Sequence, residues 1–292
     1  MKKIGFIGLG VMGKAMVKNL LKHGFEVDFY ARHKEKTLDA IEAGAVFHDT
    51  IKDAVKDADV VITMVGGPKD VEEIYLNSDG ILDSVKKGTY LIDMTSSSPS
   101  LAVRLNEEGQ KRGLHVLDVP VTGGDVGARD GTLSLMVGGS QDDMDKVLNV
   151  LKAMGTTITY MGKSGAGQCA KLVNQIMVAG AFAGMCEGLA FAKVTGLDLK
   201  TILKAVSGGL AGSRVLEILS PRIVEGDFKS GGALKYLIKD LKNGQNELKD
   251  HPISLKMMET VLKVYSDMAD EGKGDLGVQA MYDYILNSKK NA

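Results

Sequence analysis

The sequence has few side chains of the kinds that bind metals or form disulfides. Its 292 residues include only two cysteines and five histidines. Cys169 and Cys186 are 17 residues apart on one predicted helical segment, a spacing typical of neither a metal site nor a disulfide. We therefore expect reduced thiols in a cytoplasmic protein. The histidines belong to no recognisable ligand motif, and they are scattered at His23, His33, His48, His115 and His251.

The chain also lacks an excess of either charge. It has 36 lysines and arginines against 37 aspartates and glutamates, with 44% apolar and 25% charged residues. This balance is typical of a globular protein and gives no support for binding to nucleic acid or to an anionic membrane. The first apolar run, Ile4–Ile7, is too short for a signal peptide. The longer run Ile176–Ala192 contains Glu187 and many small residues, which favours a buried helix over a membrane span.

The first half of the chain alternates short β-rich runs with helical runs. Repeated strand–helix–strand units with short connections predict an α/β fold with a mainly parallel, doubly wound Rossmann sheet. The predicted strands are Lys3–Ile7, Glu26–Tyr30, Ala45–Phe47, Val60–Val65, Tyr90–Asp93, His115–Val119, Thr132–Val137 and Thr157–Tyr160. The predicted helices are Val11–His23, Lys34–Ala43, Pro68–Tyr75, Leu101–Arg112 (with serines suited to an N-cap before it) and Asp142–Met154.

The second half, after Lys163, is predicted to be helical throughout. A long helix is expected over Ala166–Val194, and shorter ones at Leu199–Ser207, Ser213–Leu219, Leu234–Leu248, Ser254–Ala269 and Val278–Leu286. We therefore expect an NAD(P)-binding Rossmann domain over 1–163 and an all-helical substrate and dimerisation domain over 164–292, joined by the long helix. Gly167, Gly180, Gly184 and Gly188 lie on or near one stripe of that helix and would permit close packing. We expect a homodimer or homotetramer formed through the helical domain.

A Gly-x-Gly-x-x-Gly pattern follows the first predicted strand and opens the first predicted helix. In that context the first glycine allows a tight turn, the second lets the backbone approach a pyrophosphate, and the third allows close helix–strand packing. The alternative is a purely structural glycine turn in an α/β protein. The context favours dinucleotide binding by residues Gly8, Leu9, Gly10, Val11, Met12 and Gly13.

The residues after the second predicted strand bear on which dinucleotide is bound. An NAD site usually has Asp or Glu at that strand end, about 20 residues after the glycines. Asp28 lies inside the strand, and the strand-end position holds Ala31, followed by Arg32, His33 and Lys34. A missing carboxylate and nearby cations favour NADP(H) over NAD(H). The alternative is an ordinary exposed basic turn.

Three later strand ends should line the same crevice, because ligands bind beyond the carboxyl ends of parallel strands. Val65 precedes two glycines, and Thr95 offers a hydroxyl at the next strand end. After Asp118-Val-Pro-Val, the Thr122 hydroxyl and the backbone N–H groups of Gly123 and Gly124 could form a concavity for a substrate carboxylate. A plain loop is the alternative for this last segment.

Hydride transfer between a nicotinamide and an alcohol carbon needs a group that carries the hydroxyl proton. No metal motif and no Ser-Tyr-x-x-x-Lys arrangement is recognisable, which leaves a lysine. Lys171 has small and apolar sequence neighbours, and burial or nearby positive charge would have to lower its pKa from the usual value of about 10.4. Asn174, one helical turn later, could orient Lys171 or hold substrate. Without further context, Lys171 and the pair Lys239-Asp240 could instead be solvated helix residues.

Four motifs in order give the whole chain a resemblance to the β-hydroxyacid dehydrogenase family, which includes 3-hydroxyisobutyrate dehydrogenase, tartronate semialdehyde reductase and the glyoxylate/succinic semialdehyde reductases. The segments that resemble the family motifs are Gly8–Leu20, Asp118–Gly124, Gly167–Gln175 and Lys239–Leu241. The resemblance implies that Lys171 is the general acid/base of an enzyme acting on a small carboxylate substrate. It implies that Thr122, Gly123, Gly124 and Asn174 hold the substrate and that Thr95 and Lys239 contact the cofactor.

The chain departs from the family pattern at several positions. Thr122 stands where Ser is usual, Gln175 where a second Asn is common, and Ser230 and Gly232 where many relatives have Pro and Phe. The missing aromatic ring should enlarge or loosen the substrate pocket. Two other functions remain open. A non-catalytic cofactor-binding sensor on the same fold would be expected to lose Lys171, and imine reduction would be expected to replace it with Asp or Tyr.

Overall fold

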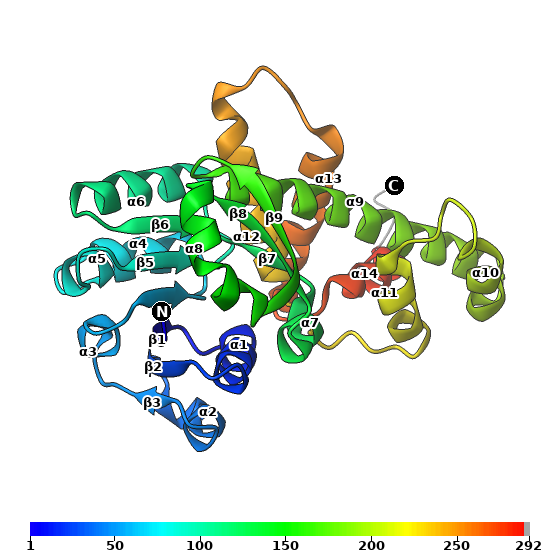
Figure 1. Ribbon diagram of the computed structural model, residues 1–292. Coiled ribbons are helices and arrows are strands. Elements are labelled where there is room, and N and C mark those ends of the chain that lie inside the picture. Colours follow the sequence, from blue (N-terminus) through cyan, green and yellow to red (C-terminus); the bar gives the residue numbers. More distant parts are fainter. Residues whose placement is uncertain (289–292) are drawn as a thin grey trace. The chain divides into compact units, whose positions relative to one another are not determined.

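A computed structural model describes residues 1–288 of the protein. The chain divides into two compact units, Met1–Lys171 and Leu172–Ala292. Helix α9 (Ala166–Val194) runs through the boundary between them. Figure 1 shows the elements along the chain.

The first unit is built on one twisted, mainly parallel sheet, which confirms the predicted α/β fold. Its strands follow the order β3-β2-β1-β4-β5-β6-β8-β7, with β9 paired to β8. Strand β8 pairs antiparallel with β6 and β7, and β9 pairs parallel with β8, so β8 and β9 run opposite to the other strands. The strands are β1 (Lys3–Ile7), β2 (Glu26–Tyr30), β3 (Val46–Phe47), β4 (Val60–Thr63), β5 (Tyr90–Asp93), β6 (His115–Asp118), β7 (Val121–Thr122), β8 (Leu133–Gly138) and β9 (Gly155–Gly162).

Apolar side chains on both faces of the sheet bury it between layers of helices. Phe6, Ile62 and Ile92 belong to the core on one face, whereas Val61 and Leu91 belong to the core on the other. Side chains of successive strand residues point to opposite faces, so a strand covered on both faces must be apolar throughout. This requirement explains why β4 is a continuous apolar run until its last residue.

The helices of the first unit include three that the sequence interpretation missed. These are α3 (Ile51–Val55), α5 (Ile81–Ser84) and α7 (Gly124–Asp130). The expected N-cap before α6 is confirmed, because the Ser98 hydroxyl accepts a hydrogen bond from the Leu101 N–H at 3.3 Å. The remaining helices of this unit are α1 (Val11–Lys22), η1 (Lys34–Lys36), α2 (Leu38–Glu42), α4 (Pro68–Leu76), α6 (Pro99–Lys111) and α8 (Gln141–Lys152).

The second unit is helical, as predicted, around a core that includes Leu234, Leu241 and Tyr265. Its elements are α10 (Leu199–Val206), α11 (Arg214–Val224), α12 (Leu234–Glu247), η2 (Leu248–Asp250), α13 (Lys256–Met268), a π-helical turn η3 (Ala269–Lys273), η4 (Val278–Ala280) and α14 (Met281–Asn287). The predicted end of α11 at Leu219 is wrong, since the helix continues through Pro221 to Val224.

Helix α9 is long and apolar enough, by length and composition alone, to cross a membrane, and within residues 1–288 no other helix is. However, Ala179, Cys186 and Leu189 on this helix are buried in the core of the second unit. One face of α9 therefore packs as a core helix does.

Candidate functional site

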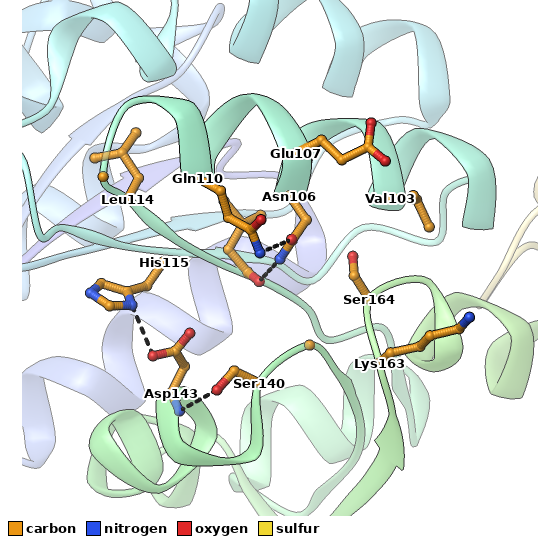
Figure 2. A pocket seen from close by; sticks show the side chains of 13 residues that line it. Val103, Asn106, Glu107, Gln110, Leu114, His115, Ser140, Asp143, Lys163 and Ser164 are labelled. Carbon is orange, nitrogen blue, oxygen red and sulfur yellow. Dashed lines mark hydrogen bonds and ion pairs between the residues drawn. The ribbon is translucent and has the colours of Figure 1, made fainter.

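A cavity of about 600 Å³ lies between α6, the start of β6 and the start of α8. Figure 2 shows its polar lining, in which His115 Nδ1 lies 2.8 Å from Asp143 Oδ1 and the Gln110 amide donates to Asn106 Oδ1 at 2.8 Å. Within the described part of the chain, none of the residues that line this cavity is a predicted site residue. His115 is the first residue of β6, so the cavity lies toward the amino end of that strand.

The predicted site residues follow the opposite ends of the strands. The final residues of five adjacent parallel strands are in register across the sheet, and they are Tyr30, Ile7, Thr63, Asp93 and Asp118. Because the carboxyl ends of parallel strands meet at one edge, the segments that follow them lie along the same edge. This edge carries the glycine turn, the basic segment and the Val65, Thr95 and Thr122 segments.

The three glycines after β1 differ in what a side chain would meet at each position. Gly8 has a φ of +100°, and a Cβ on Gly8 would clash with the backbone oxygen of Met64. A Cβ on Gly13 would clash with the backbone oxygen of Gly8. In contrast, a Cβ on Gly10, the N-cap residue of α1, would meet nothing within 4 Å. The fold itself requires glycine at positions 8 and 13, whereas the open space at Gly10 fits a pyrophosphate at the helix N-terminus.

The basic segment after β2 is held in place by neighbouring side chains. The exposed Arg32 guanidinium lies 3.2 Å from Asp70 Oδ1, and Lys34 Nζ lies 4.6 Å from the centre of the Phe47 ring. An ion pair between groups this exposed contributes little to stability. Binding of a ligand phosphate by Arg32 and Lys34 beside Ala31 stays a prediction.

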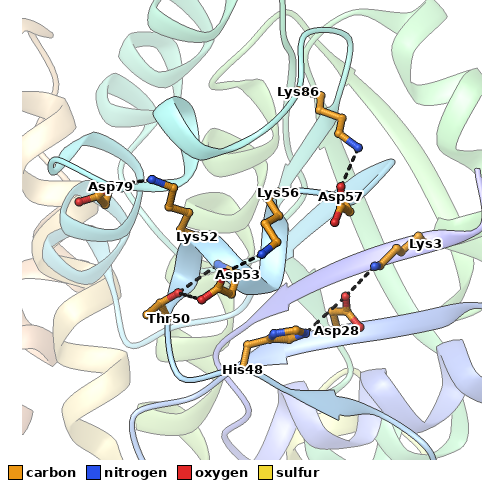
Figure 3. Close-up of polar contacts among 10 residues, drawn as sticks. All are labelled: Lys3, Asp28, His48, Thr50, Lys52, Asp53, Lys56, Asp57, Asp79 and Lys86. Carbon is orange, nitrogen blue, oxygen red and sulfur yellow. Dashed lines mark hydrogen bonds and ion pairs between the residues drawn. The ribbon is translucent and has the colours of Figure 1, made fainter.

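Asp28 lies inside β2 and not at its end, and its carboxylate forms an ion pair with Lys3. Figure 3 shows its carboxylate between Lys3 and His48, with Oδ2 2.9 Å from Lys3 Nζ and 3.4 Å from His48 Nε2. The strand end itself has no carboxylate, because Tyr30 closes β2 and Ala31 follows. The usual acidic partner of a ribose 2′-hydroxyl is thus missing at this strand end.

A set of hydrogen bonds joins the ends of β4 and β5. The Thr95 hydroxyl accepts from the Val65 N–H at 3.0 Å, while the Thr95 N–H donates to Asp93 Oδ1 at 3.1 Å. The Thr63 hydroxyl donates to the same Asp93 oxygen at 2.8 Å. Burial raises the pKa of Asp93 to about 6, and these hydrogen bonds oppose the rise. The predicted cofactor residues Val65 and Thr95 are therefore fixed relative to each other, and their contact with cofactor stays a prediction.

The carboxylate of Asp118, at the end of β6, holds the start of α9. The Gly165 N–H donates to Asp118 Oδ1 at 2.8 Å, and the Gln168 N–H donates to Oδ2 at 2.9 Å. A Cβ on Gly167 would clash with Asp118, so glycine is needed there for close approach. Burial raises the pKa of Asp118 to about 6, although the backbone N–H groups partly oppose this rise. A carboxylate at a helix N-terminus also interacts favourably with the helix dipole.

Gln168 extends this contact to the loop after β5, a role that the sequence interpretation missed. Its side chain is fully buried. Its Oε1 accepts from the Ser97 N–H at 2.9 Å, and its Nε2 donates to the Thr95 carbonyl at 2.8 Å. A buried amide costs free energy unless it is bonded, so this residue fixes the first turn of α9 against the strand ends. The only signal in the sequence is a glutamine among small residues just before Lys171.

Lys171 and the predicted substrate segment meet within the first unit. The Lys171 side chain is buried, and its Nζ donates to the Val121 carbonyl at 2.8 Å. Val121 directly precedes Thr122 in β7, and the exposed Gly123 and Gly124 follow at the start of α7. The ammonium group is thus held next to the segment expected to bind a substrate carboxylate. The interpretation of Lys171 as a solvated helix residue is wrong.

The second unit carries a separate polar cluster that contains the other two predicted residues. Asn174 Nδ2 donates to Gln175 Oε1 at 2.8 Å, and Gln175 Nε2 donates to Asp240 Oδ2 at 2.6 Å. Lys239 Nζ lies 3.2 Å from Asp240 Oδ1. Asp240 is buried, so the interpretation of Lys239-Asp240 as a solvated pair is wrong for the aspartate. The predicted roles of Asn174 and Lys239 stay predictions.

The fold and the first-unit geometry define a class of protein. A parallel sheet with a glycine turn opening a helix at its carboxyl edge, together with a buried lysine ammonium, is the arrangement of a dinucleotide-dependent oxidoreductase. Within residues 1–288, no three His, Cys, Asp or Glu side chains come together as a metal site would need.

Comparison with known proteins identifies the family. A family model described as the NAD binding domain of 6-phosphogluconate dehydrogenase matches residues 3–162. Another, described as NAD-binding of NADP-dependent 3-hydroxyisobutyrate dehydrogenase, matches residues 165–285. Each matches one half of the chain, so the matched region is nearly complete.

Individual relatives agree with the family models. The chain is 42% identical to an uncharacterised oxidoreductase, YkwC, of Bacillus subtilis over 96% of this chain and 98% of that protein. It is 33% identical to 2-hydroxy-3-oxopropionate reductase of Escherichia coli over 96% of this chain and 95% of that one. A structure of Mycobacterium tuberculosis 3-hydroxyisobutyrate dehydrogenase with L-serine is 27% identical, with a TM-score of 0.89 over 99% of this chain and 100% of that chain.

The chain belongs to the β-hydroxyacid dehydrogenase family and is an NAD(P)-dependent oxidoreductase of the 3-hydroxyisobutyrate dehydrogenase type. The resemblance seen in the four sequence motifs is confirmed, and a non-catalytic module on this fold is not favoured.

Proposed function

We propose that this protein interconverts a small β-hydroxyacid, or 2-hydroxy acid, and its semialdehyde or oxo acid, with Lys171 as the general acid/base. The observation that carries this proposal is the position of the buried Lys171 side chain. Its Nζ donates to the carbonyl oxygen of Val121 at 2.8 Å, and Val121 directly precedes Thr122. Few buried lysines occur without a specific reason. A hydroxyl or carbonyl oxygen of a ligand bound at the Thr122–Gly124 segment would lie beside a group able to carry its proton.

In this proposal each group on the chain has one task. A bound nicotinamide supplies or accepts the hydride. Thr122, Gly123, Gly124 and Asn174 hold the substrate, and Lys171 gives a proton to the carbonyl oxygen in reduction or takes it from the hydroxyl in oxidation. The dinucleotide is held by the Gly8–Gly13 turn, Arg32, Lys34, Val65, Thr95 and Lys239, and the open space at Gly10 supports this assignment.

The relatives point to one family of substrates. 3-Hydroxyisobutyrate, L-serine and the alcohol formed from 2-hydroxy-3-oxopropionate are all 3-hydroxypropionates, which differ at C2 by a methyl, ammonium or hydroxyl group. We test the proposal by following cofactor oxidation with tartronate and methylmalonate semialdehydes, whose products belong to this class, and with glyoxylate and succinic semialdehyde, whose products do not. Turnover with one of them that disappears in Lys171→Ala supports the proposal, and no turnover with any of them contradicts it.

We also propose that NADP(H) is preferred over NAD(H). The absence of a carboxylate after β2, together with Arg32 and Lys34 beside Ala31, supports recognition of a 2′-phosphate. In Arg32→Ala, kcat/KM for NADPH should fall about tenfold or more, while that for NADH changes less than twofold. A wild-type preference for NADH would contradict this assignment.

A homo-oligomer formed through α9 is the third part of the proposal. Met177 and Phe191 are 71% and 67% exposed, and their spacing places them on one helix face with Gly180 and Gly184. A contiguous exposed apolar face of this kind marks an interaction site. Small residues let a second helix approach closely, so a second copy of the chain fits this face.

A further inference from the structure

Gln168 ties the first turn of α9 to two strand ends. Its N–H is one of the donors that a helix leaves unpaired in its first turn, and it donates to Asp118 Oδ2 at 2.9 Å. Its side chain contacts the loop after β5, where Oε1 accepts from the Ser97 N–H at 2.9 Å and Nε2 donates to the Thr95 carbonyl at 2.8 Å. All of these residues belong to the first unit.

The main chain of the loop dictates the orientation of the Gln168 amide. An N–H group only donates and a carbonyl oxygen only accepts, so Oε1 must face Ser97 and Nε2 must face Thr95. The reversed amide would place donor against donor and acceptor against acceptor. Because the side chain is fully buried, water cannot replace either bond. Gln168 therefore holds this loop and the helix start in one relative position.

The loop that Gln168 contacts is itself fixed to the ends of β4 and β5. The Thr95 hydroxyl accepts from the Val65 N–H at 3.0 Å, and the Thr95 N–H donates to Asp93 Oδ1 at 3.1 Å. With the bond from Gln168 to its carbonyl, each of the three polar groups of Thr95 has a partner. Gln168 thus joins α9 to the segment that carries the predicted cofactor residues Val65 and Thr95.

Lys171 lies three residues after Gln168, within one turn of the same helix. Its Nζ donates to the Val121 carbonyl at 2.8 Å. The helix start approaches the strands closely, because a Cβ on Gly167 would clash with the carbonyl oxygens of Asp118 and Met136. The position of the Lys171 ammonium relative to the loop after β5 therefore depends on the turn that Gln168 fixes.

We infer that Gln168 is a positioning residue for the reaction: it fixes the turn of α9 that carries Lys171 against the loop after β5, so that the proton carrier and the cofactor are held in one geometry. The inference rests on the proposed function, in which Lys171 carries the proton and Thr95 contacts the cofactor. Proton and hydride transfer both depend steeply on the distance between the reacting groups. Loss of the Gln168 bonds should therefore slow the chemical step more than it weakens binding.

The first test is Gln168→Met, which keeps the side-chain length and removes both side-chain hydrogen bonds. NADPH fluorescence titration counts the cofactor-binding sites, and kcat is expressed per site, so unfolded protein does not enter the comparison. With the best substrate of the panel, kcat per site should fall about tenfold to a hundredfold, as a displacement of about 1 Å can cause. The dissociation constant for NADPH and the KM for substrate should change less than about threefold.

The second test asks whether Gln168 acts through Lys171. Gln168→Met is combined with Lys171→Ala, and the residual turnover of the double variant is compared with that of Lys171→Ala alone. If Gln168 serves to place the lysine, its loss has nothing further to remove, and the two should agree within about twofold. A role in stability alone would lower the unfolding midpoint in urea without this dependence on Lys171.

The third test is rescue by Gln168→Glu in the reduction direction. A protonated carboxyl accepts from the Ser97 N–H and donates to the Thr95 carbonyl, as the amide does, whereas a carboxylate only accepts. Burial and the neighbouring carboxylates of Asp93 and Asp118 favour the protonated form, and the Lys171 ammonium favours the ionised one. At about pH 5.5, kcat per site of Gln168→Glu should exceed that of Gln168→Met at least about fivefold. This advantage should shrink as the pH rises and the introduced carboxyl ionises.

Gln141→Met and Gln141→Glu are the matched controls, because Gln141 is exposed at the first position of α8. They make the same chemical changes at the surface, and their kcat per site should stay within about twofold of the wild type at each pH. If Gln168→Met does not bind NADPH, Gln168→Glu decides against the wild type. A kcat ratio that falls at least about fivefold from pH 5.5 to 9 supports the inference, and a constant ratio overturns it.

The outcomes separate this inference from the proposed function. Three results each overturn the inference and leave the dehydrogenase function standing. They are a wild-type kcat per site in Gln168→Met, a further large loss when Gln168→Met is added to Lys171→Ala, and no advantage of Gln168→Glu over Gln168→Met at about pH 5.5. Turnover of Lys171→Ala close to that of the wild type overturns the proton-carrier assignment, and the inference falls with it.

Discussion

Glycines in the two units meet different surroundings. In the first unit, a Cβ on Gly13 or Gly167 would clash with backbone atoms of the same chain. On the part of α9 that belongs to the second unit, a Cβ on Gly180, Gly184 or Gly188 would meet nothing within 4 Å. The chain's own packing explains the first group and leaves the second unexplained. Since glycine inside a helix costs up to about 1 kcal/mol relative to alanine, the second group supports the proposed contact with a second copy of the chain.

Gly10 shows that the surroundings of a glycine also distinguish a position left open for a ligand from one that the fold requires to be glycine. It lies in the first unit, between Gly8 and Gly13, yet it shares with the α9 glycines the absence of any close neighbour. Open space beside a helix N-terminus suits an anion, and open space along an apolar helix face suits another helix. The chemistry around each glycine therefore indicates which kind of group would fill the space beside it.

The largest expected effect comes from placing a methyl group where the chain has no room. Gly13→Ala should lower the free energy of unfolding by about 3 kcal/mol or more, because the Gly8 backbone oxygen cannot move aside as a flexible side chain would. Gly10→Ala should leave the unfolding midpoint in urea unchanged and weaken NADPH binding at least tenfold, measured by fluorescence titration. If Gly10→Ala destabilises the apoprotein or binds NADPH normally, the assignment of that space to a ligand is wrong.

The next effect concerns the buried carboxylate under α9. Burial raises the pKa of Asp118 from 3.8 to about 6, so between these values the folded state binds a proton that the unfolded state has released. The contribution of Asp118 to stability is therefore greatest below pH 4, declines as the pH rises to about 6, and is constant above that. The free energy of unfolding of the wild type minus that of Asp118→Asn should therefore fall by about 2 to 3 kcal/mol as the pH rises through this range.

Urea unfolding of the wild type and Asp118→Asn at intervals from pH 4.5 to 7.5 measures this difference. Carboxylates that do not interact with Asp118 titrate equally in both proteins and cancel from the comparison, whereas the pKa of Asp93, which the Asp118 charge raises, should fall in Asp118→Asn. A stability difference that does not change with pH would mean that Asp118 keeps an ordinary pKa in the folded protein.

The smallest effect tests the open face of α9. Gly184→Ala should raise the intrinsic stability of the chain by about 0.5 to 1 kcal/mol, since alanine favours the helix and meets no neighbour. The same variant should weaken self-association, measured by sedimentation velocity over a range of concentrations, because the methyl group prevents close approach of a second helix. Higher stability with unchanged association would place the oligomer contact elsewhere.

The regular elements could be predicted where the local pattern was strong. Glu26–Tyr30, Tyr90–Asp93 and Ala166–Val194 have the predicted bounds. Helix α7 was missed because it begins at Gly124 after Gly123 and has only seven residues, a composition that favours a loop. Such short helices are stabilised by tertiary packing, which a local pattern does not contain.

The site could be predicted as a set of motifs but not as a network. The glycine turn and Lys171 stand out because their chemistry is tied to residue type and position. The roles of Asp118 and Gln168 depend on burial and on partners 47 to 73 residues away, which only the folded chain reveals. The link from Asn174 through Gln175 to Asp240 was missed for the same reason, since its ends are 66 positions apart in the sequence.

The most direct measurement of the central claim is the turnover of Lys171→Ala alongside its affinity for NADPH. With the best substrate of the panel, kcat/KM should fall by about 10² to 10⁴, as expected for loss of a general acid/base, while the dissociation constant for NADPH changes less than threefold. The Lys171 side chain donates to the Val121 carbonyl at 2.8 Å, so thermal unfolding of the variant is measured alongside to show that it folds. Turnover close to that of the wild type would contradict the assignment of Lys171 as the proton carrier.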